Sequence, residues 1–386
     1  KFSNSLILLG SATPSLETYY NSMIINKYHI HELKERYGDA QLPKVKIIDM
    51  NQDKDFTKSQ NLISEYLIKK INTTLNNNEQ ILILHNRRGF SSIKICSESD
   101  EILKCKNCDV ILTFHASLNK LICHHCNQKY PFEKYTTQDI NFLGYGTEQL
   151  ETVLNQLFPN AGVLRMDSDS ANSMKKQKNI LNQFKNKEYN ILLGTQMIAK
   201  GLDFSNITLV AVMNAELGML IPDYRSHEKM YQLLYQVIGR SGRSNKIGHA
   251  IIQTYQPDNS LIQMATNYQS KKFYNLSLES RKSLQYPPFI KLVRFLFQSK
   301  NINQCINSAN KVYKVLKTNF SDSIIGPFPC PIERLSNQSR YHILLKIKPE
   351  KFKKSLIQIQ AVQDKKNILV SKNVKLLIDI DSISVL

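Results

Sequence analysis

The stretch ILLGTQMIAKGLDF at residues 191–204 indicates how the chain is organised. Its apolar run is typical of a parallel strand that is buried on both faces, and a Gly-Thr turn and a Lys-Gly-Leu-Asp-Phe loop follow it. In open α/β sheets, ligands bind at the carboxyl ends of the strands. Thr195 and Lys200 are therefore candidates for binding a phosphate, and Asp203 for accepting a hydrogen bond from a ribose hydroxyl or a partner loop. The alternative for this stretch alone is an ordinary strand end with an exposed lysine.

The stretch YQVIGRSGR at residues 235–243 carries a second candidate site. Gln236, Arg240 and Arg243 are spaced by four and three residues, which places them near one face of a helix or helix end. The neighbouring glycines permit close approach of a backbone or a phosphate. An arginine grips phosphate oxygens in a fork, and one placed at a transferring phosphoryl group raises the rate roughly 10³- to 10⁵-fold. A Gly-rich basic helix end is the alternative, and the candidate loop on the preceding strand weakens it.

Further apolar runs alternate with amphipathic stretches and predict a doubly wound α/β domain over about residues 60–258. The predicted strands are ILILH, GVLRM, NILLG, ITLVAVM and HAIIQTY, at residues 81–85, 162–166, 190–194, 207–213 and 249–255. Between them, GTEQLETVLNQLF predicts a helix with Thr147 as its N-cap. Its apolar face comprises Leu150, Val153, Leu154, Leu157 and Phe158.

Residues 95–145 interrupt this alternation and are predicted to be an insertion. They contain the pattern C-x2-C-x14-C-x2-C, formed by Cys105, Cys108, Cys123 and Cys126. Four thiolates at this spacing predict a zinc ribbon. Reduced buried thiols and an iron site of the rubredoxin type, which has similar knuckles, are the alternatives.

The pattern changes again after Pro257. A helical connection at about residues 259–285 leads to strands and helices in the order β-α-β-β-α-β, which predicts a small split βαβ, α+β domain. Its predicted strands are KLVRFLF, SIIG, YHILLKI and VKLLIDI, and its helices cover NQCINSANKVYKVL and KSLIQIQAVQ.

Composition points to a polyanionic partner. The chain has 386 residues, a formal net charge of +19, and 51 Lys and Arg residues spread along its length, which favours nucleic acid. An AT-rich genome, which raises the content of Lys, Asn and Ile, is the alternative cause. No stretch reaches the roughly 18 to 20 uncharged apolar residues that span a bilayer, and the start lacks the order of a signal peptide. We expect a cytoplasmic protein that does not bind membranes and uses its cysteines for metal.

The motifs GSATPSLET, NRRGF, GYGTEQLE, GTQMIAKGLDF and QVIGRSGR, in this order and spacing, resemble the PriA family of replication restart helicases. This family, also called primosomal protein N′, belongs to helicase superfamily 2. The resemblance covers essentially the whole chain and includes YPPF at residues 286–289. It implies the end of a first helicase lobe over residues 1–50 and a RecA-like second lobe over 51–258 that contains the zinc ribbon. The C-terminal α+β domain then covers residues 259–386.

The resemblance also implies roles for particular residues. The third helicase motif at residues 10–14 would couple the ATP state to strand movement, and the arginines of the sixth motif would sense the γ-phosphate. The catalytic set is Gln236, Arg240 and Arg243, and the nucleotide-binding set is Gly201 and Asp203. The nucleic-acid and coupling set is Ser11, Thr13, Arg87, Arg88, Thr195 and Lys200.

The family usually carries two interleaved zinc sites. In this chain Cys96 is followed by Ser99 where the outer site needs its second thiol, and the last Cys-x-x-Cys pair is missing from PFEKYTTQDINFLGYG. We therefore expect one zinc ion, with ATP and Mg²⁺ as further cofactors of the complete protein. The implied partners are forked or single-stranded DNA, other primosomal proteins and single-stranded DNA-binding protein. The implied function is to recognise and unwind forked DNA and to initiate replication restart by primosome assembly.

The first half of an ATP site is not apparent. The sequence contains no G-x-x-x-x-G-K-[ST] loop and no Asp-Glu-x-His stretch, and it begins with Lys. We expect a missing first lobe that is either encoded upstream or lost, no ATP hydrolysis by this chain alone, and poor anchoring of residues 1–45. In LILLGSATPSLETYY, Thr13 is a plausible N-cap and Pro14 a good first helical residue. The alternatives are an inactive zinc- and DNA-binding remnant, or another superfamily 2 translocase that acts on RNA.

Overall fold

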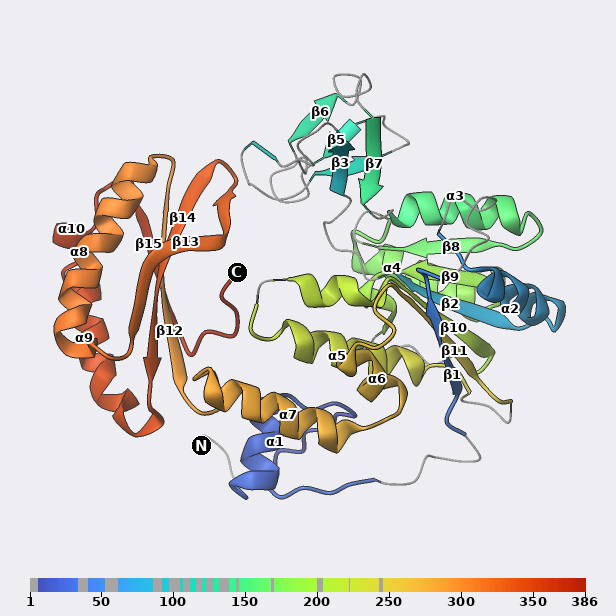
Figure 1. Cartoon of the computed structure of the whole chain (residues 1–386), viewed down its shortest axis with the longest axis horizontal. Helices are drawn as coiled ribbons and strands as arrows, with labels where there is room; N and C mark the ends of the chain where they lie inside the picture. The colour runs from blue at the N-terminus through green and yellow to red at the C-terminus, as the bar shows by residue number, and fades with distance from the viewer. Residues whose placement is uncertain are drawn as a thin grey trace.

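The larger domain of the molecule is built on a six-stranded parallel sheet (Figure 1). The computed structural model describes residues 6–33, 41–52, 62–85, 92–96, 105–106, 112–115, 120–122, 128–131, 139–143, 146–167, 170–199, 204–221, 223–242 and 246–386. The strand order is β1-β11-β10-β2-β9-β8. The strands are β1 (Lys44–Asp49), β2 (Gln80–His85), β8 (Val163–Met166), β9 (Ile191–Gly194), β10 (Ile207–Met213) and β11 (His249–Thr254). All five strands predicted from apolar runs are present.

Helices cover both faces of this sheet. They are α2 (Glu65–Asn76), α3 (Thr147–Leu157), α4 (Met174–Lys185), α5 (Ser226–Ile238), α6 (Ser260–Thr266) and α7 (Ser270–Ser283). Successive side chains of a strand point to opposite faces. Ile81 of β2 belongs to the core cluster that includes residues of α2 and α3, whereas Leu82 belongs to the cluster that includes residues of α4, α5, α6 and α7. Because both faces are buried, the central strands β2, β9 and β10 are mainly apolar, and the predicted doubly wound α/β architecture is confirmed.

Strand β1 extends the sheet beyond the five predicted strands. It pairs with β11 from Lys44 opposite His249 to Asp49 opposite Thr254. The sheet therefore begins before residue 51, the expected start of the second lobe. Strand β1 lies at the edge and is only partly buried, so its sequence KVKIID mixes lysine with apolar residues. That mixture explains why no buried strand was predicted there.

Helix α3 has the predicted apolar face but a different cap. Leu150, Val153, Leu154 and Phe158 are buried, and Leu157 packs beside them. Thr147 is the first helical residue, and Gly146 occupies the N-cap position, so the expected cap was wrong. The Thr147 hydroxyl donates instead to Asp167 Oδ2 at 2.7 Å. The Thr147 hydroxyl, which was expected to cap the helix, therefore binds Asp167 just after β8.

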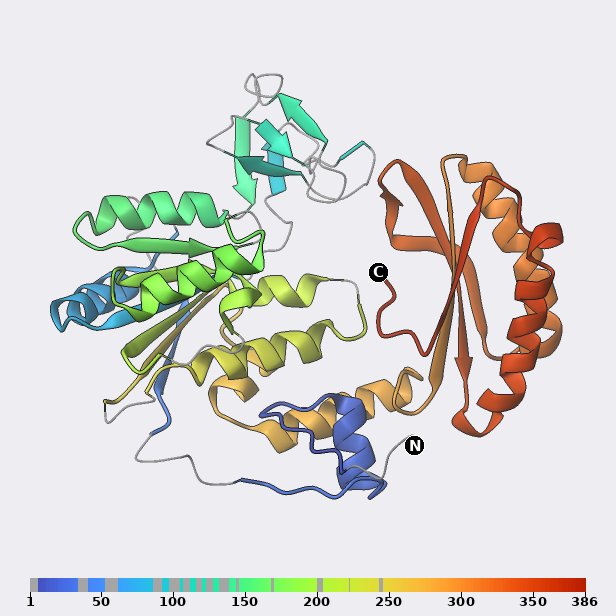
Figure 2. The same ribbon diagram turned by 180° about the vertical axis from the view of Figure 1, so that it is seen from behind.

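The C-terminal domain is an antiparallel sheet with helices on one face (Figures 1 and 2). Its elements are β12 (Lys291–Ser299), α8 (Ile302–Phe320), β13 (Ile324–Leu335), β14 (Gln338–Ile347), α9 (Phe352–Asp364), α10 (Lys366–Leu369) and β15 (Lys375–Ile380). Strand β14 lies between β12 and β13, so the β12-α8-β13 unit is split as predicted. Val293, Phe295 and Phe297 of β12 pack under α8 and α9.

The insertion leaves the large domain through β3 (Ser92–Cys96) and returns through β7 (Asp139–Leu143), which pair with each other. Between them, β4 (Thr113–His115), β5 (Lys120–Ile122) and β6 (Lys129–Pro131) form a small antiparallel sheet. Within the described parts of the chain, no helix has the length and apolar character needed to cross a membrane.

The front of the chain contains two contrasting stretches. Helix α1 (Leu16–Tyr19) and the π-helix η1 (Tyr20–Ile24) lie beside α7 (Figures 1 and 2). Together with the turn before α1 they form the docked segment, residues 13–24. The apolar run, residues 6–9, is not a strand, and its side chains are 77–95% exposed.

Candidate functional site

Helix α5 presents three polar side chains, spaced by four residues, to the turn before α1. Glu228 Oε1 accepts the Leu16 backbone N–H at 3.0 Å. Gln232 Nε2 donates to the Thr13 carbonyl oxygen at 3.3 Å, and Gln236 Nε2 donates to the Thr13 hydroxyl oxygen at 2.9 Å. Residues four apart on a helix lie on one face. The structure therefore brings together Thr13 and Gln236, which were assigned to two separate motifs.

Thr13 does not cap a helix. Ser15 is the N-cap of α1, and its Oγ accepts the Thr18 backbone N–H at 3.2 Å. Pro14 precedes the helix and is not its first residue. Both expectations were wrong because the Thr13 side chain is only 5% exposed and faces Gln236. Ser11 is exposed, and its Oγ accepts the Thr13 backbone N–H at 3.1 Å.

The docked segment is anchored, so the expectation of poor anchoring for residues 1–45 was wrong for residues 13–24. The Leu16 side chain is 1% exposed and belongs to the core of the large domain. Tyr274 of α7 donates its hydroxyl to the Pro14 carbonyl oxygen at 2.8 Å, and its ring stacks on Tyr19 with centroids 4.1 Å apart. The expectation failed because α5 and α7, which belong to this chain, hold the segment in place.

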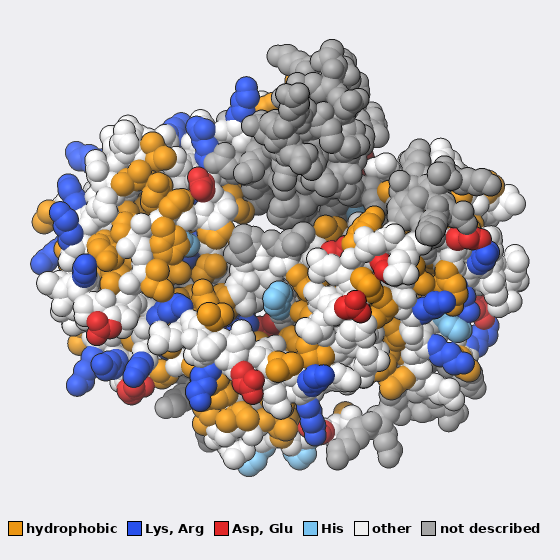
Figure 3. Space-filling view, viewed as in Figure 1, with side chains coloured by type: hydrophobic (Ala, Val, Ile, Leu, Met, Phe, Trp, Pro, Cys, Tyr) orange, Lys and Arg blue, Asp and Glu red, His pale blue; other side chains and the backbone are white. Residues whose placement is uncertain are grey.

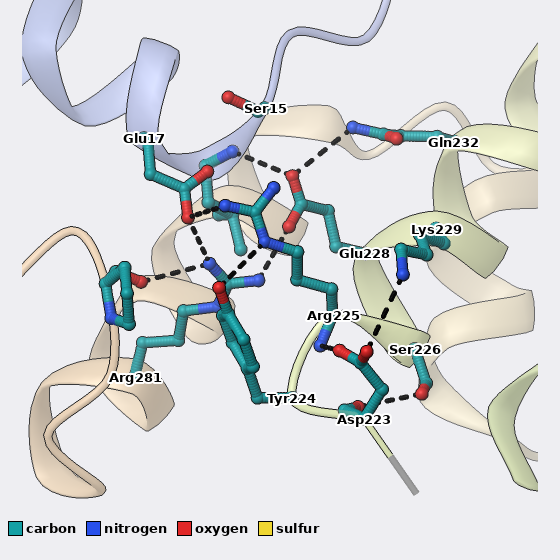
Figure 4. A network of polar contacts seen from close by, with 12 residues as sticks. Ser15, Glu17, Asp223, Tyr224, Arg225, Ser226, Glu228, Lys229, Gln232 and Arg281 are labelled. Atoms are coloured by element: carbon teal, nitrogen blue, oxygen red, sulfur yellow. Dashed lines mark hydrogen bonds and ion pairs between the residues drawn. The ribbon is translucent and has the colours of Figure 1, made fainter. Parts of the chain in front are cut away.

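An ionic network joins α1, α5 and α7 (Figure 4); Arg281 and Glu228 are buried in it, and Glu17 and Arg225 are partly exposed. Glu17 Oε1 accepts from Arg225 Nη2 at 2.7 Å and from Arg281 Nη1 at 2.8 Å. Arg281 Nη2 also contacts Glu228 Oε2 at 2.6 Å, and these two side chains are 6% and 4% exposed. Removing one partner of a buried ion pair leaves an uncompensated charge. We therefore expect the loss of any one member to destabilise the positions of the others.

Tyr224 extends this network toward the C-terminal domain. Its hydroxyl accepts from Arg225 Nε at 3.0 Å and donates to the Ser382 carbonyl oxygen at 3.1 Å. Burial raises the pKa of Tyr224, which keeps the donating proton in place. Burial alone lowers the pKa of Arg225, but Glu17 and the Tyr224 hydroxyl outweigh burial and raise it. Arg225 therefore stays a cation between two acceptors.

The end of α5 meets the loop that follows β9. Arg240 Nη2 donates to the carbonyl oxygen of Ala199, the last residue of the 3₁₀-helix η4 (Gln196–Ala199), at 2.7 Å. Thr195, between β9 and η4, is 4% exposed. A Cβ at Gly194 would lie 2.4 Å from the Met166 carbonyl oxygen, so the Gly-Thr turn requires glycine. The 3₁₀-helix after β9 and the arginine at the end of α5 are therefore neighbours.

Several predicted residues lie outside the described part of the chain. They are Arg87, Arg88, Lys200, Gly201, Asp203, Arg243, Cys108, Cys123 and Cys126. The functional roles of all the site residues stay predictions.

The charged residues of the ionic network and the amide of Gln232 were not predicted: Glu17, Arg225, Glu228, Gln232 and Arg281. A signal existed for two of them, because Glu228 and Gln232 continue the four-residue spacing of Gln236 along one face of the helix. The sequence carries no comparable signal for the other three, which come from separate elements.

One predicted zinc ligand is described. Cys105 is fully buried, and its sulfur lies 3.3 Å from the Tyr130 hydroxyl oxygen. Pairing of Thr113 with Ile122 and of Ile122 with Lys129 brings together the strand ends beside both Cys-x-x-Cys pairs. A buried thiol with a hydroxyl neighbour, at the edge where the pairs enter the sheet, fits a thiolate metal ligand.

Three family models match this chain. The helicase conserved C-terminal domain matches residues 121–245, and the Cys-rich region domain of PriA DNA helicase matches residues 105–131. The C-terminal domain of primosomal protein N matches residues 282–383. The RecA-like helicase lobe and the zinc-ribbon fold are confirmed by these matches.

Relatives match over nearly the whole chain. Replication restart protein PriA of Chlamydia pneumoniae is 37% identical over 90% of this chain and 47% of its own length. The proteins of the same name from Chlamydia muridarum and Bacillus subtilis are 36% and 34% identical, over 100% and 97% of this chain and 51% and 47% of their own lengths. The chain thus spans about half the length of the curated relatives it matches. By these matches the chain belongs to the PriA family of replication restart proteins and corresponds to the C-terminal portion of its members.

Proposed function

We propose that this chain supplies the second motor lobe, zinc ribbon and C-terminal domain of an ATP-dependent DNA helicase. The complete protein recognises forked DNA, unwinds it and initiates replication restart with other primosomal proteins and single-stranded DNA-binding protein. The hydrogen bond between Gln236 and Thr13 carries this proposal, because it joins the third and sixth helicase motifs directly. A structural helix contact would not need polar groups from both motifs.

The nucleotide set acts at the carboxyl end of β9. Arg240 is held there by the Ala199 carbonyl oxygen, and together with Arg243 it binds the γ-phosphate. Gly201 and Asp203 contact the nucleotide from the preceding loop. ATP with Mg²⁺ supplies the phosphoryl group whose transfer drives the motor. Gln236 couples nucleotide binding at this site to the position of Thr13 through their hydrogen bond.

The nucleic-acid set contacts DNA phosphates and couples them to the motor. It comprises Ser11, Thr13, Arg87, Arg88, Thr195 and Lys200. Lys and Arg side chains also line the outer rim of the C-terminal domain (Figure 3), where the exposed lysines of α8 and α9 are Lys311, Lys314, Lys317, Lys353 and Lys354. Contacts between lysines and phosphates release counterions, so DNA affinity falls as salt rises.

The zinc ribbon holds one ion through Cys105, Cys108, Cys123 and Cys126. Cys96 has Ser99, not a thiol, as its neighbour, so the outer family site cannot form. Metal analysis of the purified chain should give one zinc per chain, and Cys105→Ser should release it. Two zinc ions per chain would contradict this part of the proposal.

A pair of assays tests the motor proposal. The chain alone should bind forked DNA with a steep salt dependence and hydrolyse no ATP with or without DNA. A protein in which the chain follows an intact first helicase lobe should show DNA-stimulated hydrolysis. In that protein, Arg240→Ala should reduce hydrolysis about 10³-fold, as expected for an arginine at a transferring phosphoryl group.

The controls separate this function from its alternatives. Lys317→Ala, on the far rim, should leave hydrolysis unchanged and reduce only DNA affinity. ATP turnover by the 386-residue chain alone would overturn the two-lobe part of the proposal. Stronger binding to duplex RNA than to forked DNA would overturn its DNA part.

A further inference from the structure

Glu17 receives two arginines on one carboxylate oxygen. Arg225 precedes α5, the helix that carries Gln236, and Arg281 lies in the last turn of α7. Their guanidinium nitrogens are 2.7 and 2.8 Å from Glu17 Oε1. Arg281 keeps a second carboxylate, Glu228, but Glu17 is the carboxylate that the two arginines share (Figure 4). Glu17 therefore fixes the position of α5 relative to α7.

Arg281 connects Glu17 to the start of the C-terminal domain. Its Nη1 also donates to the Pro287 carbonyl oxygen at 3.0 Å, and β12 begins four residues later. Its guanidinium carbon lies 4.9 Å from the centre of the Tyr224 ring, which stacks on Tyr286 with centroids 4.9 Å apart. A shift of the Arg281 guanidinium would therefore move the segment just before β12 through direct contacts.

A second connection runs from Glu17 to the other end of that domain. Arg225 contacts the Tyr224 hydroxyl, which donates to the Ser382 carbonyl oxygen just after β15. Asp223 accepts a hydrogen bond from Ser384. Strands β12 and β15 are neighbours in the C-terminal sheet. The two connections from Glu17 thus end on adjacent strands, which suits rigid-body positioning of the sheet.

We propose that Glu17 is a positioning residue that couples the turn at residues 11–15 to the orientation of the C-terminal domain. Its link to the nucleotide state rests on the proposed function, because that link runs through Thr13 and Gln236. Displacement of α1 withdraws Glu17 and leaves the Arg225 and Arg281 cations facing each other. Their repulsion frees the end of α7 and, with it, the C-terminal domain. By linkage, the position of that domain equally biases the docking of α1.

The first test uses the chain as it is. Spin-labelled amino acids replace Lys185 of α4 and Lys354 of α9, which are exposed, and the distance distribution between them is measured. Leu16→Asp expels the docked segment and defines the uncoupled distribution. Glu17→Ala should shift or broaden the distribution in the same direction as Leu16→Asp. Glu32→Ala, which removes an exposed carboxylate from the same region, should leave the distribution unchanged.

Two outcomes overturn the proposal. If Glu17→Ala gives the unsubstituted distribution while Leu16→Asp changes it, the segment positions the domain without Glu17. If Leu16→Asp also leaves the distribution unchanged, the segment does not position the domain at all. Circular dichroism checks that each variant is folded, and Glu17 is suited to substitution because its side chain is 22% exposed.

The second test measures coupling in a protein that also contains the first helicase lobe. Glu17→Ala should leave DNA-stimulated ATP hydrolysis within about twofold and lower strand separation per ATP about tenfold, a typical allosteric coupling. An equal loss of hydrolysis and strand separation would indicate a purely structural role and overturn the proposal. If the unsubstituted protein hydrolyses no ATP, the proposed function fails, and the distance measurement still decides the role of Glu17.

Discussion

The apolar run and the docked segment are adjacent in sequence and opposite in environment. Leu8 in the run is 88% exposed, whereas Leu16 in the segment is 1% exposed. Both stretches contain apolar side chains, and both were assigned to the end of a first lobe whose remainder was expected to be missing. The difference shows that apolar composition gives a segment something to bury but does not provide the surface that buries it.

Backbone hydrogen bonding explains the difference. A strand leaves its N–H and C=O groups unpaired until a neighbouring strand supplies partners. The docked segment instead pairs some of its backbone groups locally, as between Thr18 and Ser15, and others with Glu228, Gln232 and Tyr274. It therefore needs only two helices as neighbours, and both are in this chain.

Breaking the ion pair between Arg281 and Glu228, beside the docked segment, should cause the largest loss of stability. Arg281→Met leaves Glu228 buried without its partner, and we expect the free energy of unfolding to fall by about 3–5 kcal/mol. Urea-induced unfolding measures this loss. Lys282→Met, at an exposed neighbouring position, is the matched control. The double variant Glu228→Gln, Arg281→Met should recover part of the loss, and no recovery would argue against the buried charge as its cause.

Two leucines of the same region offer the next largest contrast. Leu16→Ala should lower the free energy of opening of α1 by about 2–5 kcal/mol, because it leaves a cavity in the core. Leu8→Ala should change it by less than about 0.5 kcal/mol, because the side chain is exposed. Amide hydrogen exchange of α1 measures both values. Similar effects at the two positions would remove the distinction between the run and the segment.

The C-terminal domain should differ from the docked segment in how its stability depends on pH. Burial, with help from Arg294 and Arg340, lowers the pKa of His342 to about 3 from its ordinary value of 6.5. Below pH 6.5 the unfolded chain binds a proton that the folded domain refuses, so stability is lost as the pH falls toward 3. The expected loss is about 2 kcal/mol between pH 6.5 and 5.

Substitution of this histidine tests the assignment. His342→Gln should flatten the pH dependence of unfolding of the C-terminal domain over that range, followed by near-ultraviolet circular dichroism in urea. The opening of α1 should keep its own pH dependence. An unchanged slope in the variant would assign the pH dependence to other groups.

The smallest expected effect concerns the contact between the two motifs. Thr13→Val keeps the shape of the side chain and removes the acceptor of the Gln236 amide, which should lower the free energy of opening of α1 by about 1 kcal/mol. Ser11→Ala, at an exposed position, should have a smaller effect on the same amide-exchange measurement. Equal effects would mean that the Gln236 contact does not contribute to docking.

Much of the fold could be predicted because burial on both faces has a strong local signature. The central strands and the apolar face of α3 follow from runs and spacings within single elements. Strand β1 lacks that signature because it lies at the sheet edge. The cap of α1 was misassigned because three hydroxyls lie near its start and Gln236 took Thr13. The cap of α3 was misassigned because the tertiary acceptor Asp167 took Thr147.

The sequence by itself determined the parallel strands, the order of the helicase motifs and the split βαβ unit, because each depends on residues close along the chain. Only the tertiary structure decided that the docked segment is anchored and that Glu17 joins α5 to α7. Its partners Arg225 and Arg281 lie 208 and 264 residues away. No local periodicity reports a contact over that separation, since it forms only after the sheet has brought the helices together.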